Sequence, residues 1–178
     1  AAGTENFART TSMNEAQFQT ALQAVKEVVQ AAGTADSDVF VGGEMGIGNT
    51  TATAALTSAF LDLSPDITVG RGTGVNDHGM AKKREAVSTA LKLHKPDLVS
   101  PLDTLRCLGG LEIAALAGAY ISAAQKGIPS VVDGYICTVA ALAACRLNPG
   151  VRDWLLFSHR SAEPGHHYLL EALSAVPL

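Results

Sequence analysis

The sequence is poor in charged residues, aromatic residues and cysteine. Charged residues make up 17% and aromatic residues 5% of its 178 residues, and the formal net charge is −4. The longest basic run is 82–84, so the sequence lacks the electrostatic signature of a nucleic-acid-binding protein. The three cysteines form no Cys-x-x-Cys pair, which argues against a disulfide framework or a zinc site and favours a reduced cytoplasmic setting.

Long hydrophobic runs are also lacking, although 47% of the residues are hydrophobic. Glycine, lysine or aspartate interrupts each apolar stretch before it reaches the length that spans a bilayer, and no signal peptide is recognisable. We therefore expect no association with membranes. A chain of this length and apolar content can bury a core, and we expect one α/β domain over residues 1–178 that binds a small molecule.

Hydrophobic periodicity predicts helices that alternate with short strands. Residues 12–32 carry apolar side chains at helical spacing and are followed by Gly33. Four apolar runs have the length of buried strands: "DVFVG" at 38–42, "DITVG" at 66–70, "IPSVVDG" at 128–134 and "DWLLFSH" at 153–159. Further helices are predicted at 49–60, 77–94, 101–127 with a break at Gly109-Gly110, 135–147 and 166–175.

This alternation predicts a three-layer, Rossmann-like α/β fold, in which helices cover both faces of a mainly parallel sheet. Ligands of such sheets bind beyond the carboxyl ends of the strands. The four segments that follow the predicted strands are "GGEMGIGNTT", "GRGTGV", "DGYICT" and "SHRSAEPGH". We expect them to converge on one pocket.

Glycine-rich turns before helices are suited to anions, because backbone N–H groups can approach the ligand and the helix dipole adds positive potential. A phosphate or phosphoribosyl group is therefore the expected ligand, although such turns also use glycine for conformational reasons alone. "GEMGIGNTT" lacks the lysine of a P-loop, and "GRGTGV" lacks the spacing of a dinucleotide fingerprint. Neither an ATPase nor a dehydrogenase is indicated.

Five segments carry a resemblance to a known family. They are "GGEMGIGNTTATAAL", "GRGTGV", "LGGLEIAALAGAYISAA", "IPSVVDGYICTVAALAACRLNP" and "WLLFSHRSAEPGH". In the same order, they resemble segments of the nicotinate-nucleotide:dimethylbenzimidazole phosphoribosyltransferases. The resemblance implies transfer of the phosphoribosyl group of nicotinate mononucleotide to 5,6-dimethylbenzimidazole, giving α-ribazole 5′-phosphate and nicotinate in cobalamin lower-ligand assembly. It also implies a cytoplasmic homodimer. The transfer reaction requires neither a metal nor another cofactor.

The resemblance also implies roles for particular residues. Glu44 matches an active-site carboxylate that stabilises positive charge on the ribose or orients a hydroxyl, and the alternative is an acid at the start of the next helix. The residues expected to bind the nucleotide are Met45, Gly46, Gly48, Asn49, Gly72, Thr73, Gly74, Lys83, Asp133, Gly134 and Ser161.

Three of these assignments have alternatives. Lys83 matches a phosphate-binding lysine, but its basic neighbours leave the register open by one residue, and a solvated helix face is the competing interpretation. Gly72 to Gly74 match a phosphate loop or form a turn only. Asp133 accepts from ribose hydroxyls or caps the next helix.

His159 and His166 are expected to line the pocket as polar residues rather than to bind a metal.

The sequence departs from the family in two respects. Members are about twice as long, with an N-terminal region that contributes to the benzimidazole site and a C-terminal Arg-Leu-Gly-Glu-Gly motif that carries the general base. That motif does not occur here. We expect the central part of a longer enzyme that binds the nucleotide with little turnover. The alternatives are a non-catalytic nucleotide-binding paralogue and a subunit that a partner chain completes.

Overall fold

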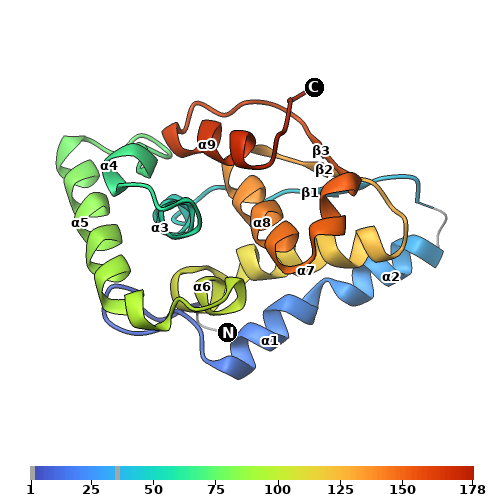
Figure 1. Cartoon of the computed structure of the whole chain (residues 1–178), viewed down its shortest axis with the longest axis horizontal. Helices are drawn as coiled ribbons and strands as arrows, with labels where there is room; N and C mark the ends of the chain where they lie inside the picture. Colours follow the sequence, from blue (N-terminus) through green and yellow to red (C-terminus); the bar gives the residue numbers. More distant parts are fainter. Residues whose placement is uncertain (1–2, 35–36) are drawn as a thin grey trace.

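The computed structural model describes residues 3–34 and 37–178 (Figure 1). The helices are α1 (Glu15–Ala24), α2 (Lys26–Thr34), α3 (Thr50–Leu61), α4 (Pro65–Thr68), α5 (Asp77–His94), α6 (Pro101–Leu108), α7 (Leu111–Gln125), α8 (Gly134–Leu147) and α9 (Pro164–Ala172). The strands are β1 (Phe40–Gly42), β2 (Ser130–Val132) and β3 (Leu155–Phe157), and 3₁₀ turns span Lys95–Asp97 and Pro149–Trp154.

The three strands form a parallel sheet in the order β1-β2-β3. Phe40, Ser130 and Leu155 lie side by side, and the register continues to Gly42, Val132 and Phe157 at the carboxyl ends. The predicted α/β class is therefore confirmed, as are the strands predicted within 38–42, 128–134 and 153–159.

The strand predicted at 66–70 is wrong. Residues Pro65–Thr68 form the single helical turn α4, which Ser64 caps by accepting a hydrogen bond from the Asp66 N–H. Proline at the first helical position already has the φ angle of a helix. A short apolar run does not distinguish a strand from a helical turn by periodicity, so this local signal decides the conformation.

The sheet presents different side chains on its two faces. Val132 and Phe157 are buried on the face against which α7 and α8 pack, and Gly42 lies against the Tyr120 ring of α7. On the opposite face, Val41 and Leu156 are 62% and 46% exposed. Part of the buried core therefore lies between the sheet and these two helices, and the rest lies among the helices.

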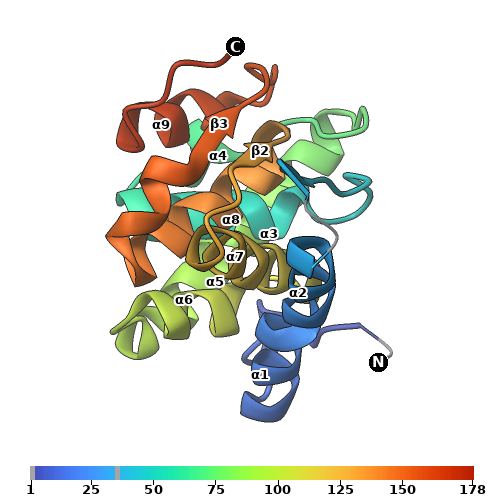
Figure 2. The same cartoon turned by 90° about the vertical axis from the view of Figure 1, so that its right-hand side faces the viewer.

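Helix α7 is central to the helical assembly, because it packs against α1, α2 and α8. In both views, α1 and α9 lie at opposite ends of the molecule (Figure 1 and Figure 2). The predicted break between α6 and α7 at Gly109-Gly110 and the helix at 77–94 are confirmed. The single helix predicted over 12–32 is instead two helices, because α1 ends at a cap on Val25. None of the helices in the described part of the chain is both long and apolar enough to cross a membrane.

The contact between α1 and α7 depends on a glycine. A Cβ atom built on Gly118 would overlap the backbone carbonyl of Leu22, so the two helices approach more closely there than any side chain permits. Gly118 is buried within α7. The backbone of α1, rather than a flexible side chain, would have to move to accommodate a methyl group.

We predict that Gly118→Ala lowers the free energy of unfolding by about 1–3 kcal/mol, despite the better helix propensity of alanine, because overpacking displaces α1. Urea unfolding followed by circular dichroism measures the change. Gly43→Ala is the control, since a Cβ atom at Gly43 meets nothing within 4 Å. Equal stability of the two variants would contradict the close-contact explanation.

Candidate functional site

All four glycine-containing segments contribute to one pocket of about 330 Å³. This holds although the segment at 70–75 follows α4 rather than a strand. The residues that line the pocket are Glu44, Thr50, Gly72, Asp133, Gly134, Tyr135, Ile136, His159, Ser161, Ala162 and Glu163. We call it the four-segment pocket. Of the predicted binding residues, it brings together Gly72, Asp133, Gly134 and Ser161 beside Glu44.

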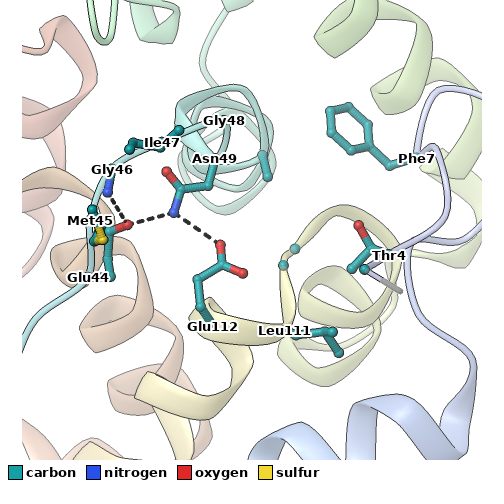
Figure 3. Close-up of a pocket in the computed structure, with 14 residues that line it drawn as sticks. Thr4, Phe7, Glu44, Met45, Gly46, Ile47, Gly48, Asn49, Leu111 and Glu112 are labelled. Atoms are coloured by element: carbon teal, nitrogen blue, oxygen red, sulfur yellow. Dashed lines mark hydrogen bonds between the residues drawn. The ribbon is translucent and has the colours of Figure 1, made fainter. Parts of the chain in front are cut away.

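A second pocket of about 480 Å³ adjoins the segment after β1 (Figure 3). Residues 44–49 and 109–112 line it together with Gly3, Thr4, Phe7 and Ala52. We call it the α7 pocket. It contains the predicted residues Met45, Gly46, Gly48 and Asn49. Glu44 lines both pockets, whereas Thr73 and Gly74 line neither.

Glu44, Asn49 and Glu112 form a polar cluster in the α7 pocket. One oxygen of Glu44 accepts from the Gly46 N–H at 2.6 Å and from Asn49 Nδ2 at 2.7 Å, and Asn49 Nδ2 also donates to Glu112 Oε1 at 3.3 Å. Figure 3 shows these side chains pointing towards one another, with Thr4 and Phe7 across the pocket. Asn49 Oδ1 is buried without a hydrogen-bond partner.

The helices that begin at the two pockets differ from the others in their first turns. Helices α1, α4, α5 and α6 are each capped by a side chain of Asn or Ser. Helices α3, α7, α8 and α9 have no side-chain cap bond, and their N-cap residues are Asn49, Gly110, Asp133 and Glu163. All four of these residues line a pocket. The positive dipole ends of these four helices therefore remain available for an anion, as do first-turn N–H groups of α3, α7 and α8. Helix α9 offers fewer donors, because it begins with Pro164, which has no N–H, and its His166 N–H donates to the Glu163 carbonyl.

The alternative that Glu44 or Asp133 caps the following helix through its side chain is not observed. Glu44 bonds within the loop before α3, and Asp133, although it is the N-cap residue of α8, makes no side-chain hydrogen bond to that helix. Instead, Asp133 accepts from Ser158 Oγ at 3.3 Å and lies 3.5 Å from His159 Nδ1. Both carboxylates consequently face the four-segment pocket.

Lys83 lines neither pocket but contacts Thr50, a residue that lines the four-segment pocket. Its Nζ donates to Thr50 Oγ1 at 2.8 Å and to the Gly70 carbonyl at 3.1 Å. By contrast, Lys82 is exposed and Arg84 lies 3.4 Å from Asp66. Partial burial lowers the pKa of Lys83, and the nearby negative charge of Glu163 opposes that shift.

Two functional features escaped the sequence prediction. Glu163 Oε1 accepts from the Gly72 N–H at 2.8 Å and so fixes the 70–75 loop, while its Oε2 is buried without a partner. Glu112 enters the α7 pocket from the first turn of α7. Glu112 is the second residue after Gly109-Gly110, and an acid at the start of a predicted helix was the available signal.

A parallel α/β fold with uncapped helix N-termini at the carboxyl ends of its strands belongs to the α/β class whose architecture is suited to small anionic ligands. Comparison with known proteins identifies the family within this class. A family model described as "Phosphoribosyltransferase" matches residues 1–178, and the chain belongs to this family.

Several relatives bear the same name. The nicotinate-nucleotide–dimethylbenzimidazole phosphoribosyltransferase of Pseudomonas aeruginosa (strain LESB58) is 56% identical over 178 residues, which are 100% of this chain and 51% of that protein. The enzyme of that name from Pseudomonas syringae pv. syringae (strain B728a) is 52% identical over 99% of this chain and 51% of its own length. This chain thus spans about half the length of the curated relatives it matches.

Solved structures agree with these relatives. The crystal structure of CobT from Thermus thermophilus has a TM-score of 0.93 and 43% identity, and covers 98% of this chain and 52% of its own. A second structure from the same organism, titled as the phosphoribosyltransferase above, has a TM-score of 0.90 and 41% identity over 98% and 51% of the two chains. The resemblance inferred from the sequence is therefore confirmed.

His166, behind the four-segment pocket, makes stability depend on pH. Burial lowers its pKa from 6.5 to about 4, and the positive charges of His159 and Arg160 add to the shift. The unfolded chain therefore binds this proton near pH 6.5, while the folded chain remains neutral down to about pH 4. The stabilisation is fully present above pH 6.5 and is lost as the pH falls towards 4.

We predict that the free energy of unfolding falls between pH 7 and 5 by about 2 kcal/mol more in the wild type than in His166→Asn, which has no titrating ring. Urea unfolding at several pH values measures the difference. Parallel pH profiles for the two proteins would show that His166 does not titrate in this way.

Proposed function

We propose that this chain is a nucleotide-binding domain that takes nicotinate mononucleotide in the four-segment pocket and serves phosphoribosyl transfer to 5,6-dimethylbenzimidazole in the α7 pocket. The observation that carries the proposal is that two adjoining pockets share Glu44 and are ringed by four uncapped helix N-termini. A transfer reaction needs a donor site and an acceptor site that meet at the reacting atom. The names of the relatives support this choice of substrates.

The phosphate of the nucleotide is the group that the cationic features favour. Lys83 contributes a point charge beside Thr50, and the first turn of α8 contributes backbone N–H groups at Gly134. Gly134 adopts a φ of +69°, and a Cβ atom there would lie 3.4 Å from His159. Gly72 serves the pocket through its place in the loop, because Glu163 already accepts from its N–H.

The ribose is the group that the carboxylates favour. Asp133 and the unpartnered Glu163 Oε2 are acceptors for its hydroxyls. Glu44 lies where the pockets adjoin, so its negative charge can stabilise the positive charge that develops at C1′ as the bond to nicotinate lengthens. A benzimidazole nitrogen forms the new bond to C1′, the nicotinate nitrogen leaves with the electron pair of the old bond, and the benzimidazole loses one proton.

The acceptor base is the group that the α7 pocket favours. Phe7, Met45, Ile47 and Leu111 supply apolar surface, and Met45 and Ile47 are 84% and 71% exposed. Glu112 and Glu44 lie at the polar side of this pocket. A flat aromatic molecule with one N–H donor suits this combination.

We also propose a cytoplasmic homodimer. The three cysteines are free thiols, which is compatible with a reducing compartment. The dimer rests on the resemblance alone.

We predict that Lys83→Ala weakens the binding of nicotinate mononucleotide about 10- to 100-fold, because it removes the charge next to the phosphate. Calorimetric titration of the purified chain measures the affinity. Lys82→Ala is the matched control, since this neighbour is exposed, and it should bind within about twofold of the wild type. Equal effects of the two substitutions would contradict the role of Lys83.

We predict that the chain alone releases little nicotinate when dimethylbenzimidazole is added, because it has no Arg-Leu-Gly-Glu-Gly motif to supply a general base. A chromatographic assay for nicotinate tests this. Robust release by the purified chain would refute it. Binding without turnover also fits a non-catalytic paralogue, and recovery of turnover on addition of a separate chain identifies a subunit that a partner completes.

A further inference from the structure

His166 lies behind the four-segment pocket and connects two of its lining residues, Ser161 and Gly134. The side chain is fully buried in the first turns of α9. Its Nδ1 is 2.8 Å from the Ser161 backbone nitrogen, and its Nε2 is 3.0 Å from Thr138 Oγ1 in α8. Thr138 Oγ1 in turn lies 2.6 Å from the carbonyl oxygen of Gly134. The imidazole itself does not line either pocket.

The direction of each hydrogen bond follows from the chemistry of the groups. The Ser161 N–H can only donate, so Nδ1 accepts and carries no proton. In a neutral ring the proton is then on Nε2, which donates to Thr138 Oγ1. The Thr138 hydroxyl hydrogen is free to donate to the Gly134 carbonyl. Every polar atom in this relay is satisfied in one protonation state of the ring.

We infer that His166 is a positioning residue, which in its neutral Nε2–H form holds the Ser161 loop and the Gly134 turn at the spacing that the ligand requires. Ser161 and Gly134 both line the four-segment pocket, on opposite ends of the relay. Protonation of Nδ1 would replace an acceptor by a second donor facing the Ser161 N–H. The relay therefore depends on a neutral ring.

The surroundings of the ring favour that neutral state. His159 faces it from the 158–163 loop at 6.4 Å between ring centroids, and Tyr135 of α8 faces it at 6.1 Å. Arg160 adds positive charge, and together with burial and His159 it lowers the pKa of His166. The neighbouring His167 differs, because it lies 2.9 Å from Glu171 on the outer side of α9.

The first test is the tautomer in the unaltered chain. Long-range ¹H–¹⁵N correlation of the imidazole nitrogens distinguishes the Nδ1–H, Nε2–H and doubly protonated rings. We expect the neutral Nε2–H form from pH 7 down to pH 5. An Nδ1–H or doubly protonated ring at pH 7 would overturn the inference.

The second test uses two variants that each keep one half of the relay. Asparagine places an amide oxygen near the position of Nδ1 and can still accept from Ser161, whereas glutamine reaches the position of Nε2 and can still donate to Thr138. We expect hydrogen exchange of the Ser161 amide to be at least tenfold faster in His166→Gln than in His166→Asn. The matched controls His167→Asn and His167→Gln should not differ. Equal or reversed exchange in the His166 pair would overturn the inference.

The effect on ligand binding rests on the proposed function and is measured separately. We expect His166→Gln to bind nicotinate mononucleotide about tenfold more weakly than the wild type, and His166→Asn to bind within about threefold. If the wild type does not bind this nucleotide, the proposed function fails, while the tautomer and the Ser161 exchange still decide the role of His166. Equal affinities of the two variants would contradict positioning by the Ser161 half of the relay.

Discussion

Parallel pairing of the three strands is the constraint on which the rest of the site depends. Because β1, β2 and β3 run in the same direction, Gly42, Val132 and Phe157 end at one edge of the sheet. The chain must leave that edge and begin a helix before it can return, so α3, α8 and α9 all start there. Their positive dipole ends meet at the same place. The absence of side-chain caps on these helices leaves that potential to a ligand.

The acids at this edge complement the positive potential of the helix ends. Glu44, Asp133 and Glu163 line one pocket, and Glu112 joins Glu44 in the other. Carboxylates near helix N-termini interact favourably with the helix dipoles, so acids and anion-binding N–H groups can occupy the same edge of the sheet. The function we propose assigns the two requirements of a phosphoribosyl compound to different groups: backbone N–H groups and Lys83 to its phosphate, and carboxylates to its hydroxyls and C1′. Contacts between segments far apart in the sequence, such as that of Glu163 with Gly72, hold these parts together.

Much of this arrangement could be predicted from the sequence where the signal is local. The amphipathic helix at 77–94, the break at Gly109-Gly110 and three of the strands follow from periodicity, glycine and proline. The strand at 66–70 could not be distinguished because Ser64 and Pro65 determine a helical turn. The glycine-containing segments after the predicted strands identified most of the residues that line the four-segment pocket. Glu112 and the His166 relay could not be found in this way, because their roles depend on partners that only the folded chain brings near, namely Asn49 and Ser161.

The central claim is that the uncapped helix N-termini at the carboxyl edge of the sheet receive the nucleotide. Two-dimensional ¹H–¹⁵N NMR during titration with nicotinate mononucleotide tests this claim most directly, because it reports on each backbone amide. We expect the largest shifts in the first turns of α3, α8 and α9 and little change in the capped first turns of α1 and α5. Binding that shifts the capped turns instead, or that leaves the amides of Thr50, Gly134 and Gly165 unchanged, would contradict the account.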